Sequence, residues 1–210
     1  MTDFRQIKKI YNIQESNGFS ENEISSVKNI FGSLPQVLVD YYVELGKYDF
    51  NQTQDSLLTP AEFQHFRNSD YLIFYCENQR CCVWGIRKGD LSQPNPPVYM
   101  SVDEEEWKLE CETLTEFLFA MACLQATFAL PYSPNIFRDL EESDLLFIQN
   151  NFKNKNVRFR EWTCGIEFYG NYDDSIIILM GGSEQMIYVS NSKEHFEEMD
   201  DVLSKLGAEM

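Results

Sequence analysis

The chain has 210 residues, of which 43% are hydrophobic and 14% aromatic, so it can bury a core and is not expected to be intrinsically disordered. Its 34 acidic and 17 basic residues give a formal net charge of −17. Lys and Arg side chains attract both nucleic acid and anionic membranes, so a chain this acidic is expected to bind neither.

Most of the acidity lies in the second half of the chain. Residues 1–102 carry 12 acidic and 9 basic side chains, a net charge of −3, whereas residues 103–210 carry 22 and 8, a net charge of −14. Such a charge speeds and orients association with a basic molecule, so we expect a basic protein as the partner. Solvated surface is the other interpretation of these acidic runs. The candidate contact residues are Asp103, Glu104, Glu105, Glu106, Glu141, Glu142, Asp173 and Asp174.

The sequence indicates a cytoplasmic protein with free thiols. The longest apolar stretch, residues 117–130, is interrupted by polar residues and is too short to cross a hydrocarbon core of about 30 Å. Residues 1–14 alternate charged with apolar residues, unlike a secretion signal. Six cysteines are present, but Cys81 and Cys82 are adjacent and Cys123 lies in an apolar helical pattern, so we expect no disulfides.

Helices are predicted in the first 66 residues. Apolar residues at helical spacing predict a short helix near residues 4–11, and Gly18 follows it as a break. Ser20 and Glu23 form a capping-box pattern that starts a second helix. A third helix opens at Leu34-Pro35, with Gly46 as its expected C-terminal cap, and the pattern Thr59-Pro60-Ala61-Glu62 predicts a short fourth helix.

The middle of the chain reads as strands followed by a buried helix. Residues 71–76 and 82–87 predict an antiparallel hairpin, and strands are expected at residues 98–102 and 107–110. A capping box at residues 113–116 starts a helix that is apolar on nearly every side and is therefore expected to be the central core helix.

A boundary is predicted at Pro131–Asn135, where two prolines end the core helix. Beyond it we expect a helix at residues 140–152 and a last helix that is capped by Asn191–Glu194 and ends near Gly207. The four strands between them are predicted at residues 157–162, 165–169, 175–180 and 186–190, with hairpin turns at residues 171–174 and 181–184. These strands fit either an extension of the first sheet or a separate layer.

Several motifs between residues 20 and 130 resemble the SUKH superfamily, which includes the yeast cell-wall assembly regulator and bacterial proteins that neutralise toxins. The resemblance rests on the order of the Leu-Pro helix start with the Tyr41-Tyr42 pair and Leu45-Gly46 behind it, the strand at residues 82–86, the entry to the next strand at residues 96–99, and the helix at residues 114–124. The key motif residues are Leu34, Pro35, Tyr41, Gly46, Trp84, Pro97 and Val98.

The resemblance implies an α+β fold with helices packed on one side of a mainly antiparallel sheet, no cofactor and no catalytic residues. We expect a SUKH-like core at residues 1–132 and an acidic C-terminal extension at residues 133–210, packed on the core as one unit. The extension departs from the family pattern.

Catalytic and metal sites are not expected. His65 and His195, the two histidines, are 130 positions apart, so a nucleophile and base would meet only through folding. The acidic runs could supply oxygen ligands to Ca²⁺ or Mg²⁺, but none has EF-hand spacing. Gly181-Gly182-Ser183 lacks the lysine of a phosphate-binding loop and reads as a turn.

The function that this sequence favours is that of a non-catalytic immunity protein that neutralises a cognate toxin domain, often a nuclease. This expected function follows from the resemblance to the SUKH superfamily together with the acidity of the chain. The alternative is a regulatory or scaffold adaptor that binds several endogenous proteins, and an enzyme is the third hypothesis.

Overall fold

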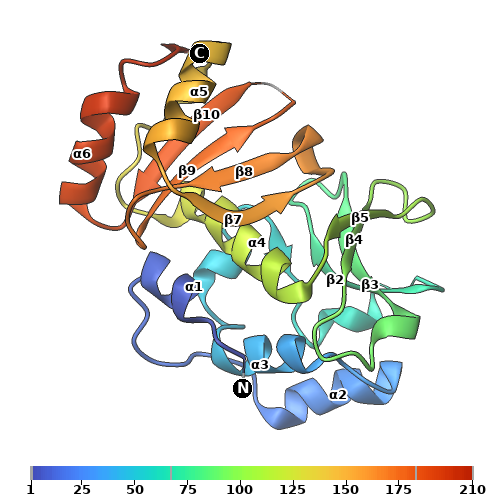
Figure 1. Ribbon diagram of the computed structural model, residues 1–210. Coiled ribbons are helices and arrows are strands. Elements are labelled where there is room, and N and C mark those ends of the chain that lie inside the picture. The colour runs from blue at the N-terminus through green and yellow to red at the C-terminus, as the bar shows by residue number, and fades with distance from the viewer. Residues whose placement is uncertain (1, 67, 183, 210) are drawn as a thin grey trace. The chain divides into compact units, whose positions relative to one another are not determined.

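The computed structural model describes residues 2–66, 68–182 and 184–209 (Figure 1). These residues form six α-helices and two antiparallel sheets, which confirms the α+β class. Contacts divide the chain into two compact units, and each is described by itself. The first unit comprises the described residues of 1–4 and 15–118, and the second those of 5–14 and 119–210.

Two helices of the first unit begin where local signals place them. In α2 (Glu21–Phe31), the Ser20 hydroxyl accepts from the Glu23 N–H over 3.3 Å, and the Ser20 N–H donates to the Glu23 carboxylate over 2.7 Å, so the predicted capping box is confirmed. The third predicted helix is α3 (Gln36–Glu44), with Pro35 as its N-cap.

Two predicted details of the first unit are wrong. The C-cap of α3 is Leu45 and not Gly46; a Cβ at Gly46 would lie 2.7 Å from the Tyr42 carbonyl oxygen, so this glycine permits close packing instead. The helix expected from Thr59 is only a 3₁₀ helix, Glu62–Gln64, although the Thr59 N–H does donate to the Glu62 carboxylate over 2.7 Å.

The first sheet has the strand order β1-β2-β3-β4-β5. The predicted hairpin is confirmed as β2 (Tyr71–Cys76) and β3 (Val83–Arg87), and β4 (Val98–Ser101) and β5 (Lys108–Cys111) follow close to their expected positions. The edge strand β1 (Ser56–Leu57) was not predicted. Trp84 and Val98, two of the motif residues, are fully buried in this unit. The membership of the chain in the SUKH superfamily stays a prediction.

The C-terminal strands form a second sheet, so they do not extend the first. Its strands are β6 (Arg138–Asp139), β7 (Asn154–Phe159), β8 (Ile166–Tyr169), β9 (Ser175–Met180), β10 (Gln185–Ser190) and β11 (Ala208–Glu209), in the order β11-β6-β10-β9-β8-β7. The strand predicted at residues 157–162 begins earlier, at Asn154, and ends at Phe159; a 3₁₀ turn over Trp162–Cys164, in which Thr163 and Cys164 adopt positive φ angles, follows it. Part of the predicted turn at residues 181–184 lies outside the described residues.

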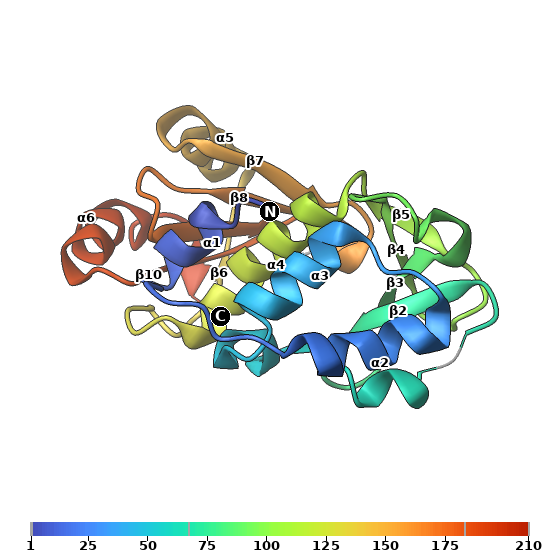
Figure 2. The same cartoon turned by 90° about the horizontal axis from the view of Figure 1, so that it is seen from below.

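Helices cover both faces of the second sheet (Figures 1 and 2). On one face, α5 (Glu142–Asn151) and α6 (Lys193–Leu203) pack against a core that includes Ile177, Leu179 and Tyr188. On the other lies α4 (Leu114–Ala129), beside α1 (Arg5–Ile10), and the Tyr11 hydroxyl donates to the Ala122 carbonyl over 2.6 Å.

The division between the two units falls inside α4, between Leu118 and Phe119, rather than at the prolines that follow this helix. The second unit also recruits residues 5–14 from the other end of the sequence. The boundary at residues 132/133 was drawn for the family-like core, and it stays a prediction.

All six cysteines are free thiols, as predicted; Cys81 and Cys164 are exposed and the other four are buried. Within the described part of the chain, none of the helices combines the length and apolar character that crossing a bilayer requires.

Candidate functional site

The acidic turn, residues 103–106, joins β4 to β5, and the side chain of its first residue organises its backbone. One carboxylate oxygen of Asp103 accepts from the backbone N–H groups of Glu105 and Glu106, each over 2.9 Å, and from the Ser101 hydroxyl over 3.0 Å. Aspartate commonly stabilises turns in this way. These hydrogen bonds, with the Glu106 N–H first, lower the pKa of Asp103, so its carboxylate stays ionised.

Two side chains from outside the turn hold its second residue. Glu104 has a positive φ of 61°, and its carbonyl accepts from the Trp107 indole N–H over 3.1 Å and from the Asn68 amide over 2.8 Å. Trp107 in turn stacks on Tyr71, with 4.0 Å between ring centroids and 11° between ring planes. The turn is therefore tied to β2 and to the loop that precedes it.

Three carboxylates and one apolar side chain remain exposed on this fixed turn. Glu104, Glu105 and Glu106 are all exposed. Val102, immediately before the turn, is 68% exposed, and no other large hydrophobic residue of the described chain is exposed to this extent. An apolar contact beside charged groups is the composition of a protein-binding surface.

Glu141 and Glu142 lie at the N-terminus of α5, where negative charge stabilises the helix dipole. Glu141 is the N-cap residue, and its N–H donates to the Asp144 carboxylate over 3.1 Å. These two acids therefore have a structural role in addition to any contact with a partner.

Asp173 and Asp174 lie in the turn between β8 and β9, and both are paired within the second unit. The Lys9 ammonium donates to Asp173 over 2.7 Å, and Nδ1 of His195 lies 2.7 Å from Asp174. Because Lys9 pairs with Asp173 and His195 contacts Asp174, these two carboxylates are less available to a partner than the sequence suggests.

The structure does not bring the two acidic pairs of the second unit together. The N–H of Leu140, next to Glu141, donates to the Glu184 carbonyl at one end of the β9–β10 hairpin, whereas Ser175, next to Asp174, pairs with Ser190 at the other end. The six residues of β9 separate the two ends, which at about 3.3 Å per residue is roughly 20 Å.

Sequence reasoning missed the surroundings of His195. Its ring stacks on Tyr172 at 3.7 Å between centroids, and its Nδ1 lies 2.7 Å from Asp174. A carboxylate that orients a histidine also occurs in catalytic triads, but the pair alone assigns no reaction. No local spacing could reveal it, because 21 positions separate Asp174 from His195.

Among the described residues, no group of three or more His, Cys, Asp or Glu side chains is placed to hold a metal ion. His65 and His195 belong to different units.

Comparisons with protein-family models, curated proteins and solved structures give no match.

Proposed function

We propose that this chain is a non-catalytic cytoplasmic binding protein that engages a basic protein partner through the acidic turn. The observation that carries the proposal is the contrast within this turn. Asp103, Trp107 and Asn68 fix its backbone, while Val102 and the three glutamates are left exposed.

A fixed turn supports tight binding because less conformational entropy is lost when the complex forms. Its charges act mainly on the rate of encounter and on the choice of partner, and Val102 supplies an apolar contact that can be desolvated. The net charge of −14 on residues 103–210 extends the attraction to a basic protein beyond the turn itself.

The more specific proposal is that of an immunity protein that neutralises a toxin domain, and it rests on the resemblance to the SUKH superfamily. A nuclease toxin presents a basic groove to its substrate. An acidic turn that enters this groove competes with the phosphates, so inhibition requires no chemistry by the inhibitor.

Co-expression tests this proposal. The tagged chain is purified from its native host, and a co-purifying basic protein is then expressed in a second host with and without the chain. We expect roughly nanomolar binding and relief of toxicity. Partners that are numerous, weakly bound and harmless to the host would contradict the immunity proposal and favour the adaptor.

Two variants connect the result to the turn. The first, Glu104→Gln with Glu105→Gln and Glu106→Gln, should weaken binding at least about tenfold. The control, Glu15→Gln with Glu194→Gln and Asp201→Asn, removes three exposed charges elsewhere and should change binding little. Equal effects of the two variants would argue against a specific role of the turn.

A further inference from the structure

A groove with a volume of about 460 Å³ lies in the first unit, beside the end of α2. Its walls are Ile30 and Phe31 from α2, Asn68 from the loop before β2, and Lys88 and Leu91 from the segment after β3. The volume is within the range of pockets that hold a ligand, about 300–1,000 Å³. Leu91 is buried, whereas Ile30 is 47% exposed, so the groove leaves apolar surface open to solvent.

Asn68 joins this groove to the acidic turn. Its side-chain amide donates to the Glu104 carbonyl over 2.8 Å, and its Oδ1 accepts from the N–H groups of Asp70 and Tyr71 over 2.9 and 3.1 Å. Both ends of the amide are therefore held, and the same side chain is a wall of the groove and a contact of the turn. The groove and the exposed glutamates are neighbouring parts of one surface.

Among the described residues that line the groove, Lys88 alone carries a charge. Its ammonium donates to the Asn68 carbonyl over 2.7 Å and to the Ser69 carbonyl over 2.9 Å, and it lies 5.8 Å from the centroid of the Phe31 ring. An ammonium has three N–H donors, so one remains for a group that enters the groove. The positive charge also disfavours a second cation there.

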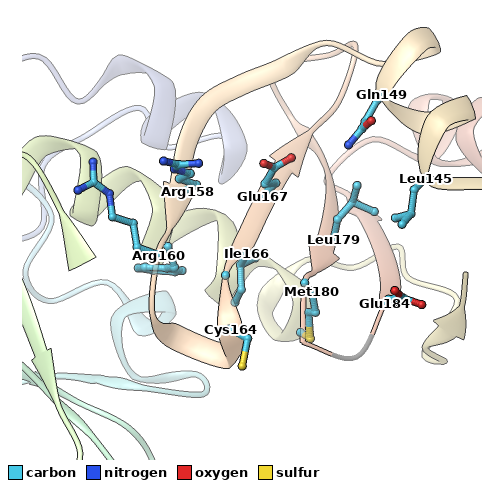
Figure 3. A pocket seen from close by; sticks show the side chains of 13 residues that line it. Leu145, Gln149, Arg158, Arg160, Cys164, Ile166, Glu167, Leu179, Met180 and Glu184 are labelled. Carbon is cyan, nitrogen blue, oxygen red and sulfur yellow. The ribbon is translucent and has the colours of Figure 1, made fainter. Parts of the chain in front are cut away.

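The cavity of the second unit shown in Figure 3 has a different character. It measures about 540 Å³, and four charged side chains are among those that line it: Arg158, Arg160, Glu167 and Glu184. An apolar group therefore meets fewer charges in the groove beside α2. Of these two sites, only the groove shares a residue, Asn68, with the contacts of the acidic turn.

We propose that this groove receives an aromatic side chain of the basic protein that the acidic turn binds, an inference that rests on the proposed function. The ring packs against Ile30, Phe31 and Leu91. The remaining N–H donor of Lys88 meets the face of the ring. Lysine or arginine residues beside this ring in the partner contact the three exposed glutamates of the turn. An aromatic anchor that fills a pocket is a common source of binding energy in protein interfaces.

Charge selects a basic protein over a second copy of this chain as the occupant. Each copy carries a formal net charge of −17, so two copies repel each other as they approach. The surface that runs from the groove to the exposed glutamates is instead complementary to an aromatic residue with basic neighbours. Because Lys88 repels these basic neighbours from the groove itself, they lie on the side of the turn.

Two capped pentapeptides test the aromatic anchor with the full chain. One has a tryptophan flanked by two arginines on each side, and in the other an alanine replaces the tryptophan. Titrations followed by methyl NMR measure both the affinity and the place of binding. We expect the tryptophan peptide to bind at least about tenfold more tightly than the alanine peptide. It should shift the methyl signals of Ile30 but not those of Ile177 in the second unit.

Three variants connect this preference to the groove and to the turn. Ile30→Ser should reduce the advantage of the tryptophan peptide to about twofold or less. The control Val43→Ser removes another exposed apolar side chain of the first unit, 42% exposed and outside this groove, and should keep the advantage. Replacing Glu104, Glu105 and Glu106 with glutamine should weaken both peptides by a similar factor, because both carry the same four arginines.

The inference is overturned if the two peptides bind equally well, or if Ile30→Ser and Val43→Ser have the same effect. Weaker binding by the glutamine variant would in both cases leave the proposed function standing. If the glutamine variant binds both peptides as the wild type does, the proposed function fails and the inference fails with it. A dimer of the chain that Ile30→Ser dissociates would make a second copy the occupant, which also contradicts the assignment.

Discussion

Gly18 packs against the backbone at the end of α3, where a Cβ would lie 1.9 Å from the Val43 carbonyl oxygen and 2.3 Å from that of Tyr42. The flanking residues fix this approach: the Asn17 N–H donates to the Glu44 carbonyl over 3.0 Å, and the Phe19 N–H to the Tyr42 carbonyl over 2.8 Å. Relief of the clash that a Cβ at position 18 would make therefore requires movement of the backbone, because rotation of a side chain cannot provide it.

We expect Gly18→Ala to lower the free energy of unfolding by roughly 1–3 kcal/mol, the usual cost of forcing extra atoms into a packed site. Gly89→Ala is the control, because a Cβ at Gly89 meets nothing within 4 Å. Chemical denaturation compares the two variants. Equal stabilities would show that the chain near Gly18 moves away easily.

Asp55 is buried, at 1% exposure, and burial raises its pKa to about 6, with the nearby charge of Glu77 adding to the effect. The folded state therefore holds the Asp55 proton more tightly than the unfolded state, whose aspartate pKa is about 3.9. Between these two values the folded state binds more protons, so stability falls as the pH rises toward and through 6.

The unfolding free energies of the wild type and Asp55→Asn test this sign. Relative to Asp55→Asn, the wild type should lose about 1 kcal/mol between pH 5.0 and pH 7.5. Other groups titrate in both proteins, so their contributions largely cancel in the difference. A difference that does not vary with pH would contradict the raised pKa.

At the scale of elements, the acidic turn depends on Asp103 for its shape. Because the Asp103 carboxylate accepts from the N–H groups of Glu105 and Glu106, Asp103→Ala should speed amide hydrogen exchange at both residues. In the matched variant Glu105→Ala, the Glu106 amide should exchange as in the wild type. Unchanged exchange in Asp103→Ala would mean that Trp107 and Asn68 suffice to hold the turn.

Elements with strong local signals were predictable from the sequence. The capping box at Ser20 and Glu23 and the hairpin of β2 and β3 have patterns that depend only on neighbouring residues. Strands β1, β6 and β11 have two residues each, which is too short for a periodicity to show. The end of β7 was misplaced because the aromatic and basic residues up to Trp162 read as a continuing strand, whereas Trp162–Cys164 form a 3₁₀ turn.

The candidate site was predictable only in part, because contacts between residues that are distant in the sequence hold it in place. The acidic run at residues 103–106 is plain in the sequence, but its anchors come from elsewhere. Asn68 lies 36 positions before Glu104, and Tyr71 meets Trp107 only after the strands pair. The groove beside α2 likewise joins Ile30, Asn68 and Lys88, which are distant in the sequence and meet only after folding.

At the scale of the whole molecule, acidic and basic residues are distributed more unevenly than the net charges of the two halves of the chain suggest. Residues 133–210 carry 15 acidic and seven basic residues, yet residues 153–160, which include β7, carry four of these bases and no acid. Basic side chains on an edge strand also discourage pairing with other sheets. The attraction to a basic partner therefore belongs to particular surfaces, and the acidic turn combines three exposed glutamates with an exposed apolar neighbour, Val102.

The proposed function requires that this turn steers a basic protein into a specific complex. The most direct measurement is the association rate constant of the chain with its co-purified partner, by stopped flow, as a function of ionic strength. For the wild type the rate should fall steeply as salt rises, and neutralising Glu104, Glu105 and Glu106 should flatten this dependence and lower the rate about tenfold at low salt. An association rate that ignores both salt and these three charges would contradict the claim.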